Sequence, residues 1–281
     1  MPNTLGDSFS GDRLLLVGGG KMGTALLQGW LDAGMDKSQF GVQEPTPSET
    51  LVATGVALNP SQDFAPQIAV LAIKPQLADD VLPKLSLPKG CLVISLMAGV
   101  PTARMADLLG GGVACVRTMP NTPAAIGRGM TALFAEASVT DAQRDKASKL
   151  MAAVGATAWL DNEKLIDAAT AISGSGPAYI FHLAEAMSSS AQALGLDEAT
   201  ARTLAVQTII GAAAMLQGDD TDAGQLRRNV TSPGGTTEAA LDVLMGEGGL
   251  GEMMRRATQA AAERAHELAQ PTPQSGDAQA D

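Results

Sequence analysis

One short segment of the sequence combines adjacent glycines with several hydroxyl side chains. Residues 230–238 read Val-Thr-Ser-Pro-Gly-Gly-Thr-Thr-Glu, and apolar residues at helical spacing follow as far as residue 244. Gly234 and Gly235 leave backbone N–H groups uncovered, and a helix that begins directly after them adds the positive end of its dipole. Ser232, Thr236 and Thr237 place three hydroxyls at the same corner. The segment therefore predicts a binding site for a small anion.

A second glycine-rich segment lies near the start of the chain. Residues 18–23 read Gly-Gly-Gly-Lys-Met-Gly, which fits the pattern G-x-G-x-x-G, and they follow a short apolar run and open a helical segment. In that context the pattern is typical of a dinucleotide-binding loop. Gly18 would permit the tight turn, Gly20 would let the pyrophosphate approach the backbone, and Gly23 would let the helix pack on the sheet. The alternative is a glycine-rich turn without a ligand.

Three further residues follow apolar runs and are candidates for contact with the same cofactor. Glu44 ends the second run, where an acid bonds the ribose 2′-hydroxyl and repels a 2′-phosphate, so it favours NAD over NADP. Lys74, followed by Pro75, ends the third run and could reach cofactor oxygens. Asn121 lies between two prolines after a later run. The alternatives are a solvated carboxylate, a solvated lysine and an ordinary turn.

The sequence offers few groups that could donate a proton to a substrate. Of the two histidines, His182 lies in an apolar helical stretch and is interpreted as packed, and His266 lies near the end of the chain and is interpreted as exposed. A substrate that needs little acid help is therefore favoured. A cyclic imine qualifies, because its C=N bond can arrive protonated and accept a hydride in a site that supplies mainly positioning. Thr237 could donate a hydrogen bond to the ring nitrogen.

The elements that must position these residues change in kind near residue 161. Before it, short apolar runs alternate with helical segments, which predicts a parallel sheet covered on both faces. The predicted strands are residues 14–17, 40–43, 68–73, 92–96, 114–117, 131–134 and 156–159. After it, the chain is rich in alanine and periodic at helical spacing, and Pro177 suits the first turn of a helix that ends near residue 193. The fold class is α/β: an N-terminal Rossmann-type doubly wound domain at 12–161, then an all-α domain at 162–270.

The remaining segments and the composition limit what the protein can be. Residues 1–11 are interpreted as a loose leader and 271–281 as a disordered tail, while residues 201–216 are apolar nearly all round and suggest helices interleaved with a second subunit. A net charge of −11 without a basic cluster argues against nucleic-acid and membrane partners. The sequence lacks the spacing of histidines and cysteines that is typical of metal sites, and Cys91 and Cys115 lie in apolar runs. It has neither an unbroken apolar run long enough to cross a membrane nor a secretory signal. We expect a cytoplasmic protein without a metal site.

Taken together, these segments resemble the Δ1-pyrroline-5-carboxylate reductase family over residues 13–270. The resemblance is carried by residues 18–23, 70–75, 117–123, 173–179 and 230–244. It implies reduction of (S)-1-pyrroline-5-carboxylate to L-proline by NADPH or NADH. It also implies a dimer built from intertwined C-terminal helices, often assembled further into a decamer, with each active site joining one subunit's nucleotide domain to its partner's helices.

The resemblance also assigns roles to single residues. Ser232 and the backbone of Gly235 and Thr236 would hold the substrate carboxylate, with Gly234 in the same loop, and Thr237 would be the catalytic hydroxyl near the ring nitrogen. The predicted cofactor-binding residues are Gly18, Gly19, Gly20, Lys21, Met22, Gly23, Glu44, Ala72, Lys74, Pro75, Ala98 and Asn121.

Two departures and two alternatives accompany this resemblance. Family members usually carry His-Pro and then Leu-Lys-Asp before the loop, where this chain has Asp222-Ala223 and Leu226-Arg227-Arg228. The family mostly prefers NADPH, whereas Glu44 argues for NADH.

One alternative function is that of a dehydrogenase of a hydroxy acid or another imine, but the predicted helix 177–193 lacks the lysine that hydroxy-acid enzymes use. The other alternative is a protein that only senses a nucleotide, which would not need the anion-binding loop at Ser232–Thr237.

Overall fold

The computed structural model describes residues 5–61, 63–218 and 222–269. It forms two compact units, one made of the chain up to Gly174 together with the stretch from Ala261 onward, and the other of Ser175–Ala260. The first is called the nucleotide unit below and the second the helical unit. The predicted disordered tail, 271–281, lies outside the described residues, as do residues 1–4 of the predicted leader.

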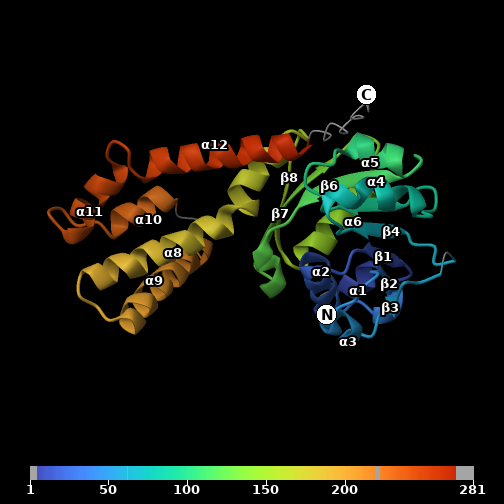
Figure 1. Cartoon of the computed structure of the whole chain (residues 1–281), viewed down its shortest axis with the longest axis horizontal. Coiled ribbons are helices and arrows are strands. Elements are labelled where there is room, and N and C mark those ends of the chain that lie inside the picture. The colour runs from blue at the N-terminus through green and yellow to red at the C-terminus, as the bar shows by residue number, and fades with distance from the viewer. Residues whose placement is uncertain (1–4, 62, 219–221, 270–281) are drawn as a thin grey trace, which may run out of the picture. The chain divides into compact units, whose positions relative to one another are not determined.

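The nucleotide unit is built on one eight-stranded sheet with the strand order β3-β2-β1-β4-β5-β6-β7-β8 (Figure 1). Its strands are β1 (Leu14–Val17), β2 (Phe40–Gln43), β3 (Ala57–Leu58), β4 (Ile68–Leu71), β5 (Leu92–Ser95), β6 (Ala114–Met119), β7 (Gly129–Ala135) and β8 (Gly155–Trp159). Its helices include α1 (Leu5–Ser8), α2 (Lys21–Asp32), α3 (Glu49–Ala53), α4 (Ala78–Val81), α5 (Thr102–Leu108), α6 (Asp141–Ala152) and α7 (Leu165–Ala169). The predicted Rossmann-type fold is confirmed.

Hydrophobic clusters cover both faces of this sheet, which explains why its strands are apolar without interruption. Successive residues of β1 point to opposite faces, so that Leu14 and Leu16 join the cluster with α2 and α6, while Leu15 and Val17 join the cluster with α4 and α5. Trp30 of α2 is fully buried, and its indole Nε1 donates to the Leu150 carbonyl of α6 at 2.8 Å. The sheet is therefore held between two layers of helices.

The structure corrects two parts of the predicted sheet. Strands β6 and β7 pair antiparallel, whereas the other neighbours are parallel. The prediction of an all-parallel sheet is wrong at this pair, because an apolar run carries no information on strand direction. Strand β3 has only two residues and was not predicted.

The prediction of a loose leader is wrong for its described part. Helix α1 covers Leu5–Ser8, and Phe9 is fully buried in the core. The amide of Gln39 donates to the carbonyls of Phe9 and Asp12 at 2.7 and 3.1 Å. The segment is polar on average, which hid its one aromatic side chain, and burial of Phe9 together with the Gln39 hydrogen bonds anchors it.

The helical unit begins at Ser175, the N-cap of α8 (Gly176–Ala193), ends within α12 (Leu250–Ala269), and contains no strand in its described residues. Its helices are α8, α9 (Glu198–Gly218), α10 (Ala223–Asn229), α11 (Thr236–Met245) and the first part of α12. Helices α8 and α9 pack against each other (Figure 1). Before them, α7 packs against β6 and β7, with Ile166 in a cluster with Met119 and Ala132, and a π-helical turn at Thr170–Gly174 follows. The domain limits 12–161 and 162–270 stay predictions.

Much of the helical unit's apolar surface is exposed within the single chain. In α9 only Ala201 and Ala205 are buried. Among the described residues, α9 is also the helix that is long and apolar enough to cross a membrane by length and composition alone. The sequence has no unbroken apolar run in α9, since polar residues such as Gln207 interrupt this helix.

His182 on α8, interpreted as packed, has a side chain that is 82% exposed beside Glu185, so that interpretation is wrong for the single chain.

Candidate active site

The glycine-rich loop of the nucleotide unit joins β1 to α2. Gly18 has φ +101°, and a Cβ there would lie 2.6 Å from the Ala72 carbonyl oxygen. A Cβ at Gly23 would clash with the Gly18 carbonyl, whereas a Cβ at Gly20 would meet nothing within 4 Å. Gly20 is also the N-cap of α2 and gives it no side-chain cap. The turn is thus tight where it faces the protein and open above the helix N-terminus, which is the shape that a diphosphate needs.

Glu44 lies directly after β2, and its carboxylate is bound to the glycine-rich loop. Oε2 accepts a hydrogen bond from Gly19 N at 2.8 Å, and Oε1 accepts one from Thr46 N at 3.1 Å. The Asn59 side chain bonds to the Glu44 backbone twice. Its Oδ1 accepts from Glu44 N at 2.9 Å, and its Nδ2 donates to the Glu44 carbonyl at 3.0 Å. Asn59 has φ +45°, a conformation that asparagine tolerates better than most residues. Asn59 was missed in the sequence, although Asn before Pro60 marks a turn.

The other cofactor candidates lie at the carboxyl ends of the central parallel strands. Ala72 follows β4, and its N donates to the Val17 carbonyl at 2.7 Å. Lys74 is exposed, and a short 3₁₀ turn begins after it at Pro75. Ala98 follows β5 and packs against the cluster that contains Met119. These positions therefore share one edge of the sheet with the glycine-rich loop, the edge where ligands bind in such folds.

The second glycine-rich loop belongs to the helical unit and joins α10 to α11. Gly234 has φ +69°, and Gly235 is the N-cap of α11 without a side-chain cap. Gly235 N donates to the Ser232 carbonyl at 3.0 Å, and Gly234 N donates to the Glu238 carboxylate at 2.6 Å. The N–H groups of the first helical turn, at Thr236 and Thr237, have no acceptor in the helix itself. These two are better placed than the Gly235 N–H to receive an anion.

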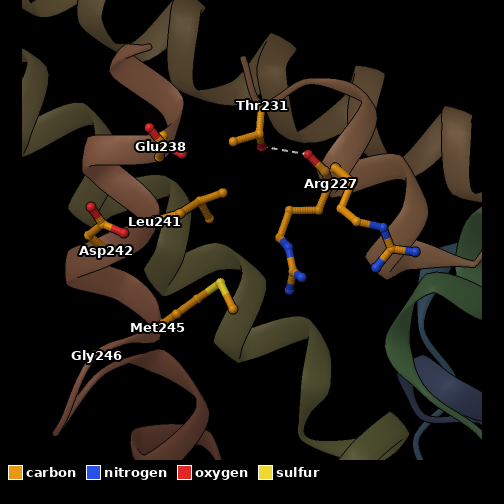
Figure 2. Close-up of a pocket in the computed structure, with 8 residues that line it drawn as sticks. Arg227, Thr231, Glu238, Leu241, Asp242, Met245 and Gly246 are labelled. Atoms are coloured by element: carbon orange, nitrogen blue, oxygen red, sulfur yellow. Dashed lines mark hydrogen bonds between the residues drawn. The ribbon is translucent and has the colours of Figure 1, made fainter. Parts of the chain in front are cut away.

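A hollow of about 360 Å³ lies beside this loop. Figure 2 shows that α10 and α11 supply its walls, with Arg227 on one side and Leu241 and Met245 on the other. Thr231 Oγ1 donates to the Arg227 carbonyl at 2.7 Å and ties the loop to the end of α10. The full lining is Arg227, Arg228, Thr231, Glu238, Leu241, Asp242, Met245 and Gly246.

Comparison with known proteins identifies the family. The family model for pyrroline-5-carboxylate reductase dimerisation matches residues 163–268, and the model for coenzyme F420-dependent NADP oxidoreductase matches residues 13–99. A pyrroline-5-carboxylate reductase of Pseudomonas aeruginosa is 38% identical over 93% of this chain and 98% of its own. A pyrroline-5-carboxylate reductase of Pisum sativum is 35% identical over 94% of this chain and 97% of its own. This chain belongs to the pyrroline-5-carboxylate reductase family.

Solved structures of this reductase family agree with the fold. The pyrroline-5-carboxylate reductase of Coxiella burnetii matches with a TM-score of 0.86 at 38% identity, covering 92% of this chain and 99% of its own. The Plasmodium falciparum pyrroline carboxylate reductase, solved with NADP bound, matches with a TM-score of 0.80 at 28% identity. The match covers 93% of this chain and 100% of the Plasmodium falciparum chain. The likeness therefore extends over both compact units of this reductase.

Asn121 of the reductase lies just after β6, and both ends of its amide are already engaged. Its Oδ1 accepts from Met130 N at 2.8 Å, and its Nδ2 donates to the Ser173 carbonyl at 3.0 Å. A direct bond to the cofactor can use only the remaining amide hydrogen or lone pair. Asn121 thus fixes the loop after β6 against the turn at Ser173, in addition to its predicted contact with the cofactor.

A buried arginine of the reductase was missed in the sequence. Arg117 on β6 is 4% exposed, and its Nη atoms lie 3.4 Å from Glu163 Oε1 and 3.8 Å from Asp167 Oδ1. Asp167 also lies 3.5 Å from His266 Nδ1. Glu163 accepts hydrogen bonds from the backbone N and the hydroxyl of Thr102. The cluster ties the sheet to the start of α7, and no local sequence pattern pairs Arg117 with acids so far along the chain.

Proposed function

We propose that this protein reduces (S)-1-pyrroline-5-carboxylate to L-proline, the last step of proline biosynthesis. The dihydronicotinamide of NADPH or NADH supplies the hydride when it is bound. The observation that carries the proposal is that one chain of this family combines an open helix N-terminus at Gly20 with a hydroxyl-rich glycine loop at the start of α11. The first suits a dinucleotide and the second suits a small carboxylate.

The loop before α11 is proposed to hold the substrate carboxylate. Ser232 would donate its hydroxyl, and Thr236 and Thr237 would donate their first-turn N–H groups, aided by the helix dipole. Gly234 and Gly235 shape the turn, because Gly234 adopts φ +69° and a Cβ on Gly235 would lie 2.9 Å from the Ser232 carbonyl. An anion held at this point would leave the rest of a small ring free to face the cofactor.

The Thr237 hydroxyl is proposed to hydrogen-bond the ring nitrogen: it accepts from the N–H of the protonated imine, and it donates to the nitrogen lone pair that forms once hydride has been added. The imine nitrogen is basic enough to arrive protonated, so hydride addition at carbon neutralises the iminium and gives the amine without a protein acid. His182 and His266 are not needed for this step. Thr237 is half-buried, and its hydroxyl would orient the ring and stabilise the nitrogen lone pair that forms.

The glycine-rich loop after β1 is proposed to hold the cofactor diphosphate at the start of α2. Gly18, Gly20 and Gly23 supply the shape, and the edge formed by Ala72, Lys74, Ala98 and Asn121 would bind the rest of the cofactor. Glu44 argues for NADH, since its carboxylate already lies on Gly19 and would repel a 2′-phosphate. The NADP-bound relative argues for NADPH, so the two cofactors must be compared directly.

The exposed apolar surface of the helical unit is proposed to pack against a second copy of the chain. The match to the dimerisation model over residues 163–268 supports this, as do large exposed side chains such as Phe181 and Leu204. Each active site would join one subunit's nucleotide unit to its partner's helices, and such dimers would assemble further into a decamer. A cytoplasmic location and the lack of nucleic-acid or membrane partners stay predictions.

Initial rates with purified protein test the proposed reaction. NADH and NADPH should each be supplied with and without the imine, and oxidation is expected only when the imine is present. Thr237→Val should lower kcat/KM by the equivalent of about 1–3 kcal/mol, the cost of a lost buried partner. Thr258→Val is the control, because within the described part of the chain the Thr258 hydroxyl bonds to carbonyls of its own helix, at 2.9 and 3.2 Å. Absence of imine-dependent oxidation with either cofactor would contradict the proposal.

A further inference from the structure

The sequence Gly-Gly-x-x-Glu occurs twice in the helical unit, each time where a helix starts. It covers Gly234–Glu238 before α11 and Gly248–Glu252 before α12. In both copies the glutamate accepts a hydrogen bond from the N–H of the glycine four residues earlier, at 2.6 Å for Glu238 and 3.2 Å for Glu252. Both of these glycines have φ +69°. The two copies thus share one local structure, in which a carboxylate is held at the start of a helix.

The two copies differ in their surroundings. Glu238 directly follows Thr237 and lines the hollow beside the loop that carries Ser232 (Figure 2). Glu252 lines an adjoining hollow of about 700 Å³, which shares Arg227, Leu241, Met245 and Gly246 with the first but does not include Glu238. Two arginines and two acids line the first hollow: Arg227, Arg228, Glu238 and Asp242. The charges of the lining therefore balance.

Of the two acids that line the hollow, Glu238 is the one that is hydrogen-bonded to the glycine-rich loop before α11. Its carboxylate holds the Gly234 N–H at 2.6 Å, so its negative charge is fixed next to the place proposed for the substrate carboxylate. Arg228 does not offset it by direct pairing with an acid, because its Nε and Nη2 bond to the neutral Gln225 Oε1 at 3.1 and 2.7 Å. A second anionic group on a ligand would therefore face a carboxylate that forms no direct ion pair with any described arginine, although the lining as a whole is neutral.

We propose that Glu238 is a specificity-determining residue that restricts this loop to ligands with a single carboxylate. The inference rests on the proposed function and adds a substrate class to it. With Glu238 ionised, one carboxylate is accepted by the first turn of α11 and a second is repelled. Removal of this one charge leaves two arginines against one acid in the hollow, which then favours a dianion.

Glu238→Gln is the informative variant, because a glutamine oxygen can still accept the Gly234 hydrogen bond while the charge is lost. Glu252→Gln makes the same change in the second copy and is the matched control. The probes are cyclopentanecarboxylate, a monoanion, and cis-cyclopentane-1,3-dicarboxylate, a dianion. Each is measured as a competitive inhibitor of imine reduction and, separately, by calorimetric titration of the full-length protein.

In Glu238→Gln the affinity for the dianion relative to the monoanion should rise about fivefold or more at low salt, and the rise should shrink at high salt. The KM for the imine should fall as well, by a larger factor than any change in kcat. Glu252→Gln should leave the affinity ratio at its wild-type value. An unchanged ratio in Glu238→Gln would overturn the proposal, and so would an equal change in both variants.

The two measurements separate this inference from the proposed function. If the protein reduces the imine but the monoanion neither competes nor binds, the loop is not the carboxylate site and the inference fails while the reductase activity stands. If no imine is reduced but calorimetry shows the change in Glu238→Gln alone, the proposed function fails and the assignment of Glu238 stands.

Discussion

The two compact units of this protein bury their apolar side chains to very different degrees. In the nucleotide unit, large side chains such as Trp30, Phe40 and Leu92 are almost fully enclosed. In the helical unit, Phe181 is 64% exposed and Leu204 is 52% exposed. Burial of such side chains stabilises a fold by about 1.5–3 kcal/mol each. The nucleotide unit therefore has a core of its own, whereas the helical unit leaves many of its large apolar side chains exposed in the single chain.

The glycine-rich loops of the two units differ in the same way. The loop at Gly18 is closely packed, since a Cβ on Gly18 would meet Ala72 and one on Gly19 would meet Leu51 and Glu44, whereas one on Gly20 would meet nothing within 4 Å. The loop at Gly234 has open space around it, and a hydrogen bond to Glu238 holds it. Both loops nevertheless keep a carboxylate of the chain on a glycine N–H, since Glu44 binds Gly19 as Glu238 binds Gly234. A rigid sheet edge fixes the first loop, and local bonds fix the second.

The largest effect is expected from charges placed on the exposed apolar surface of α9. The double variant Leu204→Asp/Ile210→Asp should prevent dimer formation and abolish measurable activity, because burial of unpaired carboxylates costs several kcal/mol. Sedimentation velocity and kcat/KM are the measurements. Val52→Asp is the control, since Val52 on α3 is 53% exposed and Leu204 is 52% exposed, yet Val52 belongs to the nucleotide unit. If the double variant stayed dimeric and active, the comparison of the two units would be wrong.

The next effect concerns two glycines of the nucleotide unit. Gly23→Ala should weaken cofactor binding and lower the free energy of unfolding by about 1–3 kcal/mol, because its Cβ would press on the Gly18 carbonyl. Gly20→Ala should weaken cofactor binding with little loss of stability, since nothing lies within 4 Å of that Cβ. Urea unfolding and titration with NADH and NADPH separate the two. Equal loss of stability in both variants would contradict the assigned roles.

A smaller effect is expected from Glu44→Ser. Loss of the carboxylate removes the repulsion of a 2′-phosphate, so the ratio of kcat/KM for NADPH over NADH should rise by about tenfold. Asn59→Ala is the companion variant, because Asn59 holds the Glu44 backbone and should change the ratio less. An unchanged ratio in Glu44→Ser would show that the carboxylate serves only to bind Gly19 and Thr46.

The last prediction, which applies only above pH 9, concerns the two thiols in the core of the nucleotide unit. Burial raises the pKa of Cys91 to about 12 and that of Cys115 to about 11, the latter helped by Glu136 and Glu163. Both values exceed the 9.0 of a free thiol, so above pH 9 the unfolded chain ionises first. The free energy of unfolding should then fall with rising pH, by at most about 1.4 kcal/mol per pH unit for each thiol.

Urea unfolding between pH 8 and 10.5 measures this pH dependence. The variant Cys91→Ala/Cys115→Ala should show a weaker decline over the same range. Identical slopes in the two proteins would mean that the thiols are ionised or exposed in the folded state.

Much of the nucleotide unit follows from its sequence, because burial on both faces makes a strand such as β4 a plain apolar run. The direction of β7 does not follow, since pairing geometry depends on where the preceding turn leads the chain. Phe9 was missed because a single buried aromatic side chain does not alter the polar average of its segment. In the site, glycine spacing predicts both loops, but the bonds from Glu44 and Glu238 to glycine N–H groups depend on the folded backbone. Arg117 and its acids are far apart in sequence and meet only in the fold.

A mixed dimer tests most directly the claim that each active site needs the nucleotide unit of one chain and the helices of another. Gly23→Val subunits should lack cofactor binding, and Ser232→Ala/Thr237→Val subunits should lack the carboxylate site and the hydroxyl. The two are carried on different affinity tags and purified as one dimer. If the sites are shared, one of the two contains both intact halves, and the mixed dimer should be far more active than either parent. A mixed dimer no more active than its parents would contradict the account.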